Sequence, residues 1–141
     1  MSDILNFHFN VDGEDFTSAG QASVQIKKNL RQLGLPPEII RRVSIAMYEG
    51  EINMVIHARG GVADVNVTEE YIEIILKDNG PGIKDIDKAM QEGYSTATDN
   101  IRSLGFGAGM GLPNMKRYTD YLDIDSVVCE GTLITMRVNI N

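Results

Sequence analysis

Two glycine-punctuated segments constrain this chain more than any other feature of its sequence. The first reads Asp-Asn-Gly-Pro-Gly over residues 78–82, and the second has a glycine at every second position over residues 105–111. Glycine lets the main chain approach a ligand closely and leaves backbone N–H groups able to face phosphate oxygens. Both segments lie downstream of a predicted helix with polar residues at four-residue steps, and together these features predict a nucleotide-binding site.

That helix carries Glu49, Asn53 and His57 on one face, because positions four residues apart nearly superpose on an α-helix. The Asn53 amide oxygen can complete an octahedral Mg²⁺ shell shared with phosphates and waters. Glu49 can accept a proton from an attacking hydroxyl, and His57 can position Glu49 or reach the phosphates. A solvated polar stripe is the alternative interpretation. Gly50 costs a helix about 1 kcal/mol relative to alanine, which indicates a close approach by another group.

Asp78 lies where a predicted strand enters the first glycine segment. Its carboxylate can accept hydrogen bonds from the exocyclic amino group of adenine, while Gly80 and Gly82 leave space for the ring. An ordinary Asp-Asn-Gly-Pro-Gly turn is the alternative. Thr132, at the start of the last predicted strand, can hydrogen-bond the base through water or simply serve as a β-branched strand residue.

The second glycine segment matches neither common phosphate-binding motif. The chain contains no GxxxxGK[ST] sequence, and glycines at alternate positions do not fit GxGxxG, which argues against a dinucleotide-binding fold. The final glycine, Gly111, opens a predicted helix whose first amides suit a phosphate oxygen. The alternative is a lid that needs glycine for motion and not for ligand contact.

Hydrophobic periodicity predicts an α+β fold. Alternating runs indicate strands and 3.6-residue spacing indicates helices. The predicted strands are 5–11, 62–67, 71–77, 121–128 and 132–140, and the predicted helices are 17 or 18–33, 37–58, 83–92 and 110–118. No repeat or linker divides the chain, so we expect a single domain over 1–141. A two-layer sandwich, with helices on one face of a mixed, mainly antiparallel sheet, is the simplest architecture.

Composition excludes several classes of protein. A net charge of −7 and a pI near 4.7 argue against a nucleic-acid surface, which needs clustered Lys and Arg. The single cysteine, Cys129, cannot form an internal disulfide, and its apolar neighbours favour a packed thiol. The sequence contains no signal-like apolar core and no stretch long enough to span a membrane. We therefore expect a cytoplasmic protein.

The order of these motifs resembles the GHKL (Bergerat-fold) ATPases, which include gyrase, Hsp90, histidine kinases, MutL and the anti-sigma serine kinases. The resemblance covers nearly the whole chain. It implies that Glu49 and Asn53 form the N box, with Asn53 on Mg²⁺. It further implies that the loop from Asp78 holds adenine, that residues 105–111 close over the phosphates and that Thr132 supports the base.

Within this superfamily the chain looks most similar to stand-alone bacterial serine/threonine kinases of the anti-sigma and stress-switch type. We expect no dimerising helical hairpin with a phospho-accepting histidine before this domain, and gyrase, MutL and Hsp90 chains are far longer. Residues 53–61, 93–96 and 111–117 carry this resemblance. It implies ATP and Mg²⁺ as cofactors, a STAS-domain protein as phosphorylated partner, and a sigma factor as a second partner. A homodimer is a further expectation, and an ATP-dependent switch without phosphoryl transfer is the alternative.

The resemblance and the motifs together define the expected site. Glu49 is the expected catalytic base and Asn53 the metal ligand, and Arg102 or Lys116 is expected to neutralise the terminal phosphate. The expected nucleotide contacts are Asn53, His57, Asp78, Gly80, Gly82, Tyr94, Ser95, Thr96, Arg102, Gly105, Gly107, Gly109, Met110, Gly111, Leu112, Lys116 and Thr132.

Overall fold

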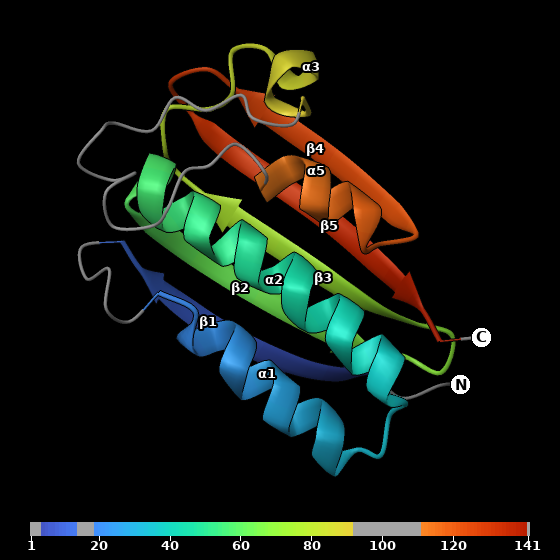
Figure 1. Cartoon of the computed structure of the whole chain (residues 1–141). Helices are drawn as coiled ribbons and strands as arrows, with labels where there is room; N and C mark the ends of the chain where they lie inside the picture. Colours follow the sequence, from blue (N-terminus) through green and yellow to red (C-terminus); the bar gives the residue numbers. More distant parts are fainter. Residues whose placement is uncertain (1–3, 14–18, 92–110, 141) are drawn as a thin grey trace.

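The computed structural model of the chain describes residues 4–13, 19–91 and 111–140 (Figure 1). Its strands are β1 (Leu5–Asp12), β2 (Gly60–Val67), β3 (Tyr71–Asp78), β4 (Tyr121–Val127) and β5 (Gly131–Asn139). Its helices are α1 (Gln21–Gln32), α2 (Pro37–Ala58), α3 (Ile86–Ala89) and α5 (Gly111–Arg117). Each of these elements corresponds to a predicted one. None of the described helices is long and apolar enough to cross a membrane.

The strands form one five-stranded sheet in the order β1-β2-β3-β5-β4, and every neighbouring pair is antiparallel. Helices α1, α2 and α5 lie against one face of this sheet, with α2 across its centre (Figure 1). The predicted α+β, two-layer architecture is therefore confirmed. A mixed sheet was expected, whereas the pairings among the described strands are antiparallel throughout.

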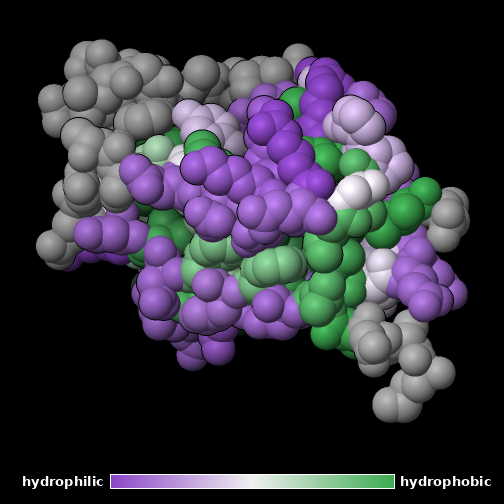
Figure 2. Space-filling model, turned by 90° about the horizontal axis from the view of Figure 1, so that it is seen from below, coloured by the Kyte–Doolittle hydropathy of each residue, from purple (hydrophilic) through white to green (hydrophobic). Residues whose placement is uncertain are grey.

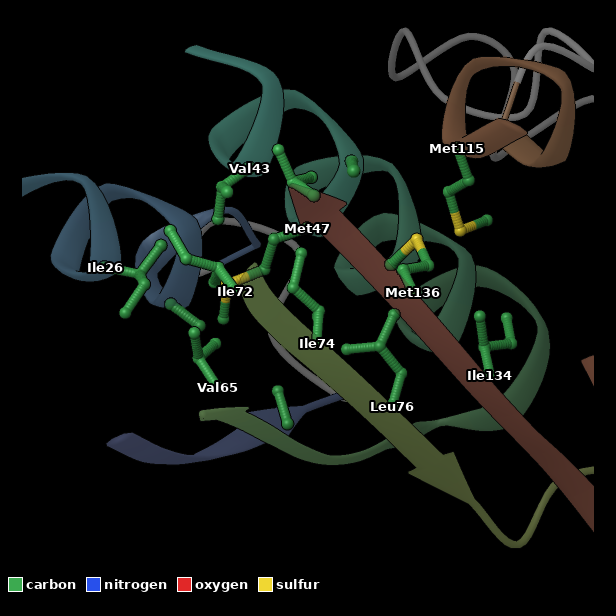
Figure 3. Packing of buried hydrophobic residues seen from close by; sticks show 14 of the residues in the cluster. Ile26, Val43, Met47, Val65, Ile72, Ile74, Leu76, Met115, Ile134 and Met136 are labelled. Carbon is green, nitrogen blue, oxygen red and sulfur yellow. The ribbon is translucent and has the colours of Figure 1, made fainter. Parts of the chain in front are cut away.

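The core lies between α2 and the centre of the sheet (Figure 3). Alternate residues of β3 and β5 point toward the helices because successive side chains of a strand face opposite sides. Burying each large aliphatic side chain contributes roughly 1.5–3 kcal/mol, which fixes α2 over these two strands. The fully buried residues include Ile72, Ile74, Leu76, Met136 and Val138 from the strands and Val43 and Met47 from α2.

Gly50 allows α2 to approach the sheet closely. A Cβ atom at this position would overlap the Cδ1 of Leu76 and would lie 3.5 Å from the Sδ of Met115 on α5. The close approach inferred from the sequence is therefore a packing contact with β3 and α5. It fixes the depth of α2 directly beside Glu49.

The helix α1 begins later than predicted and is capped differently. It starts at Gln21, and its N-cap residue Gly20 adopts a left-handed conformation with φ 97° and no side-chain cap of its own. Ser18, one of the two positions at which the helix was expected to begin, lies outside the described residues. Ala22, Ile26 and Leu30 face the core, whereas Val24 is exposed because it lies on the opposite side of the helix.

The two other corrections concern α3 and the β4–β5 turn. The helix α3 is shorter than the predicted 83–92, because Asp85 caps it by accepting a hydrogen bond from the Lys88 amide at 3.1 Å. Cys129 is exposed and not packed. Its apolar neighbours are exposed as well. Val127 lies on the exposed face of β4, and Val128 and Cys129 lie in the turn that follows, where Cys129 has φ 70°.

The surface agrees with this account of the core. Seen from below, hydrophilic residues cover much of the visible face, and hydrophobic residues gather in a band between them (Figure 2). The polar side of α1 includes the exposed residues Gln21, Gln25, Lys27, Lys28 and Arg31.

Candidate nucleotide site

The helix α2 supplies one wall of the candidate site. Glu49, Asn53 and His57 are all half-buried on this 22-residue helix. An α-helix rises 1.5 Å per residue, so Glu49 and His57 are separated by about 12 Å along its axis. The predicted stripe is therefore continuous, and its two ends meet different parts of the protein.

The Glu49 end of the stripe meets the start of α5. Asn114 donates a hydrogen bond from its Nδ2 to the Oε1 of Glu49, at 3.2 Å. A Cβ atom added to Gly111 would lie 3.9 Å from the other carboxylate oxygen, Oε2. The expectation that Gly111 opens a helix is confirmed. Sequence reasoning missed Asn114, although its place three residues into that helix was a usable signal.

The other end of the stripe meets the loop that follows β3. Asp78 Oδ1 accepts hydrogen bonds from the amide of Gly80 at 2.9 Å and from the amide of Thr132 at 3.3 Å. Asp78 and Thr132 are also direct partners in the β3–β5 register. The described hydrogen bonds of this carboxylate therefore use Oδ1, which leaves Oδ2 as an acceptor for a ligand.

The glycines of this loop have a packing role in addition to the predicted one. A Cβ atom at Gly80 would lie 2.5 Å from the Cβ of Ala58, at the end of α2. Gly82 has φ +77°, and a Cβ atom there would lie 2.6 Å from the carbonyl oxygen of Val127. Glycine therefore lets the loop lie against both α2 and the β4–β5 turn, which holds Asp78 at the end of the helix.

The Asp78 end of the candidate site contains a serine that sequence reasoning missed. Thr132 is buried, and its Oγ1 lies 2.9 Å from the Oγ of Ser126 on β4. The same serine oxygen accepts a hydrogen bond from the Ile83 amide at 2.8 Å. Ser126 pairs with Thr132 in the β4–β5 register, so it joins the loop after β3 to the last two strands.

A second carboxylate on α2, Glu51, was also missed, and it has a structural role. Only 2% of Glu51 is exposed. Its Oε2 accepts hydrogen bonds from the amides of Gly20 and Ala22 at 2.8 and 3.1 Å, and its Oε1 accepts one from Ser23 at 3.1 Å. Because Gly20 has no side chain, Glu51 provides the cap for α1. The lack of a capping side chain at Gly20 was the available signal.

The remaining predicted contacts fall in three groups. Leu112 is buried in the hydrophobic core. Lys116 is exposed and lines a groove of about 420 Å³ between α3, α5 and β4, together with Met90 and Leu122. Residues that lie outside the described part of the chain are Tyr94, Ser95, Thr96, Arg102, Gly105, Gly107, Gly109 and Met110. Among the described residues, no group of three or more His, Cys, Asp or Glu forms a metal site by itself.

Burial lowers the pKa of His57 below its ordinary value of 6.5, and the negative charge of Asp78 partly opposes this shift. His57 is therefore electrostatically linked to the Asp78 end of the site. A histidine whose folded-state pKa is lowered binds fewer protons than the unfolded chain. Its contribution favours folding above pH 6.5 and is lost as the pH falls from there toward the lowered pKa.

The same physics predicts the effect of removing the Asp78 charge. In Asp78→Asn the pKa of His57 should fall further, because the negative charge that raises it is removed while the burial that lowers it remains. Titration of the imidazole signals by NMR would measure this, and the chain has only one other histidine, His8. Asp64→Asn is the matched control, since Asp64 contacts His8 and not the candidate site. An unchanged or raised His57 pKa in Asp78→Asn would contradict the link.

Comparisons with known proteins identify the family of the chain. A family model described as a histidine kinase-like ATPase domain matches residues 14–138. The serine/threonine-protein kinase RsbT of Bacillus subtilis is 33% identical over 118 residues, which cover 80% of this chain and 83% of the relative. The anti-sigma F factor of Priestia megaterium is 28% identical over 146 residues, which cover 97% of this chain and 92% of the relative.

A solved structure shows the same fold. The Acinetobacter baumannii histidine kinase AdeS superposes with a TM-score of 0.51 at 15% identity, covering 96% of this chain and 68% of that one. At this identity the likeness concerns the fold alone. The family model, however, covers most of the chain, and the motif order had predicted the same group. The chain belongs to the histidine kinase-like ATPase family.

Proposed function

We propose that this protein is a Mg-ATP-dependent serine/threonine kinase that phosphorylates a STAS-domain partner. The observation that carries the proposal is the arrangement along α2. The polar face of this helix is half-buried. At one end of the face the Glu49 carboxylate contacts α5, and at the other end the face meets the loop that contains Asp78. A nucleotide lying along this face would have its base at Asp78 and its terminal phosphate near Glu49.

Asp78 would select the base. Its Oδ1 is already held by two backbone amides, so the carboxylate is fixed before a ligand arrives. Its Oδ2 would accept a hydrogen bond from the adenine amino group. Because this acceptor is already fixed, less conformational entropy is lost when the ligand binds.

Asn53 would provide the protein ligand for Mg²⁺. It lies one helical turn from Glu49, and its amide oxygen is a hard donor of the type that Mg²⁺ accepts in small number, with phosphates and waters as the other ligands. The donor chemistry therefore fits this cofactor. When bound, Mg²⁺ would neutralise charge that develops on the phosphates.

Glu49 would act as the general base toward the hydroxyl of the partner. Asn114 donates to Oε1, and this contact fixes the orientation of the carboxylate. Oε2, on the side of Gly111, would then accept the proton as the hydroxyl attacks the terminal phosphate. Catalysis would depend mainly on positioning, as is general for phosphoryl transfer.

Phosphoryl transfer itself tests the proposal. The protein would be incubated with labelled ATP, Mg²⁺ and a STAS-domain protein encoded beside it. We expect a phosphorylated serine or threonine on the partner, identified by mass spectrometry. If the protein binds ATP but transfers no phosphate to the partner, the proposed kinase activity is wrong and only nucleotide binding remains.

The adenine contact gives a separate prediction for binding. Asp78→Asn should weaken Mg-ATP affinity by about 10- to 100-fold, because hydrogen bonds to charged groups contribute roughly 1.5–3 kcal/mol. Isothermal titration calorimetry would measure this change. Asp64→Asn, on the opposite face of the sheet, should bind ATP like the wild type. Equal affinities of the wild type and Asp78→Asn would argue against the base position.

The second candidate is an ATP-dependent binding protein that holds a sigma factor without phosphoryl transfer. The relationship to an anti-sigma F factor over 97% of this chain favours it. Partner binding that requires ATP and persists in Glu49→Gln would support this candidate. Equal partner affinity with and without ATP would exclude it. Both candidates imply a cytoplasmic protein, because their partners act there.

A further inference from the structure

A row of three polar residues crosses the end of the sheet beneath the proposed base position. Asp78, Thr132 and Ser126 are direct partners in the β3–β5 and β4–β5 registers. The row before it, Leu76, Ile134 and Ile124, belongs to the core. Side chains two residues apart along a strand share a face, so the polar row lies on the helix-covered side.

The hydrogen atoms of this row can be assigned from its contacts. A serine hydroxyl has one hydrogen and two lone pairs. Ser126 Oγ accepts from the Ile83 amide at 2.8 Å, and it lies 3.2 Å from the carbonyl oxygen of Gly131 and 2.9 Å from Thr132 Oγ1. A carbonyl can only accept, so Ser126 keeps hydrogen bonds to both groups only when its own hydrogen points at Gly131. In that arrangement the 2.9 Å contact between the two hydroxyls is a hydrogen bond that Thr132 donates to Ser126.

This assignment fixes the character of Thr132. Once its single hydrogen points at Ser126, Thr132 Oγ1 offers only lone pairs to a ligand or to a bridging water. Its neighbour in the row, the Asp78 carboxylate, is also an acceptor. Two adjacent acceptors can both receive hydrogen bonds from an amino group. They repel a carbonyl oxygen, because its lone pairs would then face theirs.

We propose that Ser126 is a specificity-determining residue that holds Thr132 as an acceptor and thereby favours a 6-aminopurine over a 6-oxopurine nucleotide. It acts through Thr132 and is a positioning residue, without ligand contact of its own. This inference rests on the proposed nucleotide site. It adds to that site a residue that discriminates between purines and does not depend on phosphoryl transfer.

The test compares two nucleotides that differ at position 6 of the purine. Affinities for Mg-ATP and Mg-ITP would be measured by calorimetry for the wild type and for Ser126→Ala. Without the serine, the Thr132 hydroxyl can rotate and donate to the 6-oxo group. The ratio of ATP affinity to ITP affinity should fall about tenfold, which corresponds to one hydrogen bond.

Three further variants separate specificity from stability. Ser126→Thr keeps a hydroxyl at this position and should keep the wild-type ratio. Thr132→Val removes the acceptor but leaves Ser126 in place, and should lower the ratio. Adding Ser126→Ala to Thr132→Val should change the ratio no further, because the two residues act through one contact. Thr132→Val keeps the proposal testable even where Ser126→Ala folds poorly.

The outcomes distinguish this inference from the proposed function. An unchanged ratio in Ser126→Ala or in Thr132→Val, with ATP still bound by the wild type, overturns the role of Ser126 and leaves the kinase proposal intact. Equal weakening of both nucleotides in Ser126→Ala has the same meaning, since it indicates a structural role only. A wild-type protein that binds neither nucleotide would overturn both proposals.

Discussion

Replacing Glu49 by glutamine should slow phosphoryl transfer by about 10²- to 10⁴-fold, the usual contribution of a general base. Glutamine has the same shape and keeps an oxygen that can accept the hydrogen bond from Asn114. It cannot take up a proton, however, so the chemical step loses its acceptor. ATP affinity should stay within a few-fold of the wild type, because the base acts in the transition state and not in nucleotide binding.

Single-turnover transfer to the STAS-domain partner would measure this rate, with calorimetry for ATP affinity. Glu38→Gln is the matched control, since Glu38 lies in the first turn of the same helix and is exposed. It should transfer phosphate at the wild-type rate. Undiminished transfer in Glu49→Gln would remove Glu49 from the mechanism. A loss of ATP affinity as large as the loss of rate would make it a binding residue.

The second large effect concerns stability. Glu51→Ala should lower the free energy of unfolding by about 3–5 kcal/mol, because three buried backbone amides lose a charged acceptor. The carboxylate is the acceptor for three backbone amides at the start of α1. Without it, these buried N–H groups lose their acceptor, and each such loss costs about 1–3 kcal/mol before relaxation.

Urea denaturation would measure this change. Glu38→Ala should cost less than about 1 kcal/mol, because its ion pair with Arg41 is on the surface. Glu51→Gln should fall between these values, since its amide keeps one acceptor oxygen but turns a donor toward the helix amides. A Glu51→Ala protein as stable as Glu38→Ala would show that α1 does not depend on this cap.

Glu49 and Glu51 illustrate how two carboxylates on one helix acquire different roles. Two residues apart on an α-helix correspond to a rotation of about 200°, so their side chains leave opposite sides of α2. Glu49 meets Asn114 of α5, whereas Glu51 is buried against the start of α1. The first therefore has an oxygen available for chemistry, and both oxygens of the second are used in the fold.

The sequence by itself determined the secondary structure and the family. Alternation in 71–77 and 132–140 located β3 and β5 to within one residue, because the two-residue period of a strand is a local property. Gly34 and Gly60 have positive φ just past the ends of α1 and α2, and a glycine at such a position is also a local signal. The order of Glu49, Asp78, the glycine segment and Thr132 identified the GHKL resemblance, which the family model bears out.

Only the tertiary structure decided which groups meet. Glu51 accepts a hydrogen bond from the N-cap residue of α1, 31 residues earlier. Asp78 accepts one from an amide 54 residues later, and Glu49 contacts a side chain 65 residues away. The exposure of Cys129 and the contact of Ser126 with Thr132 also depend on where a turn and a strand register fall. Such pairings are set by how helices and strands pack together, and no local pattern of residues encodes them.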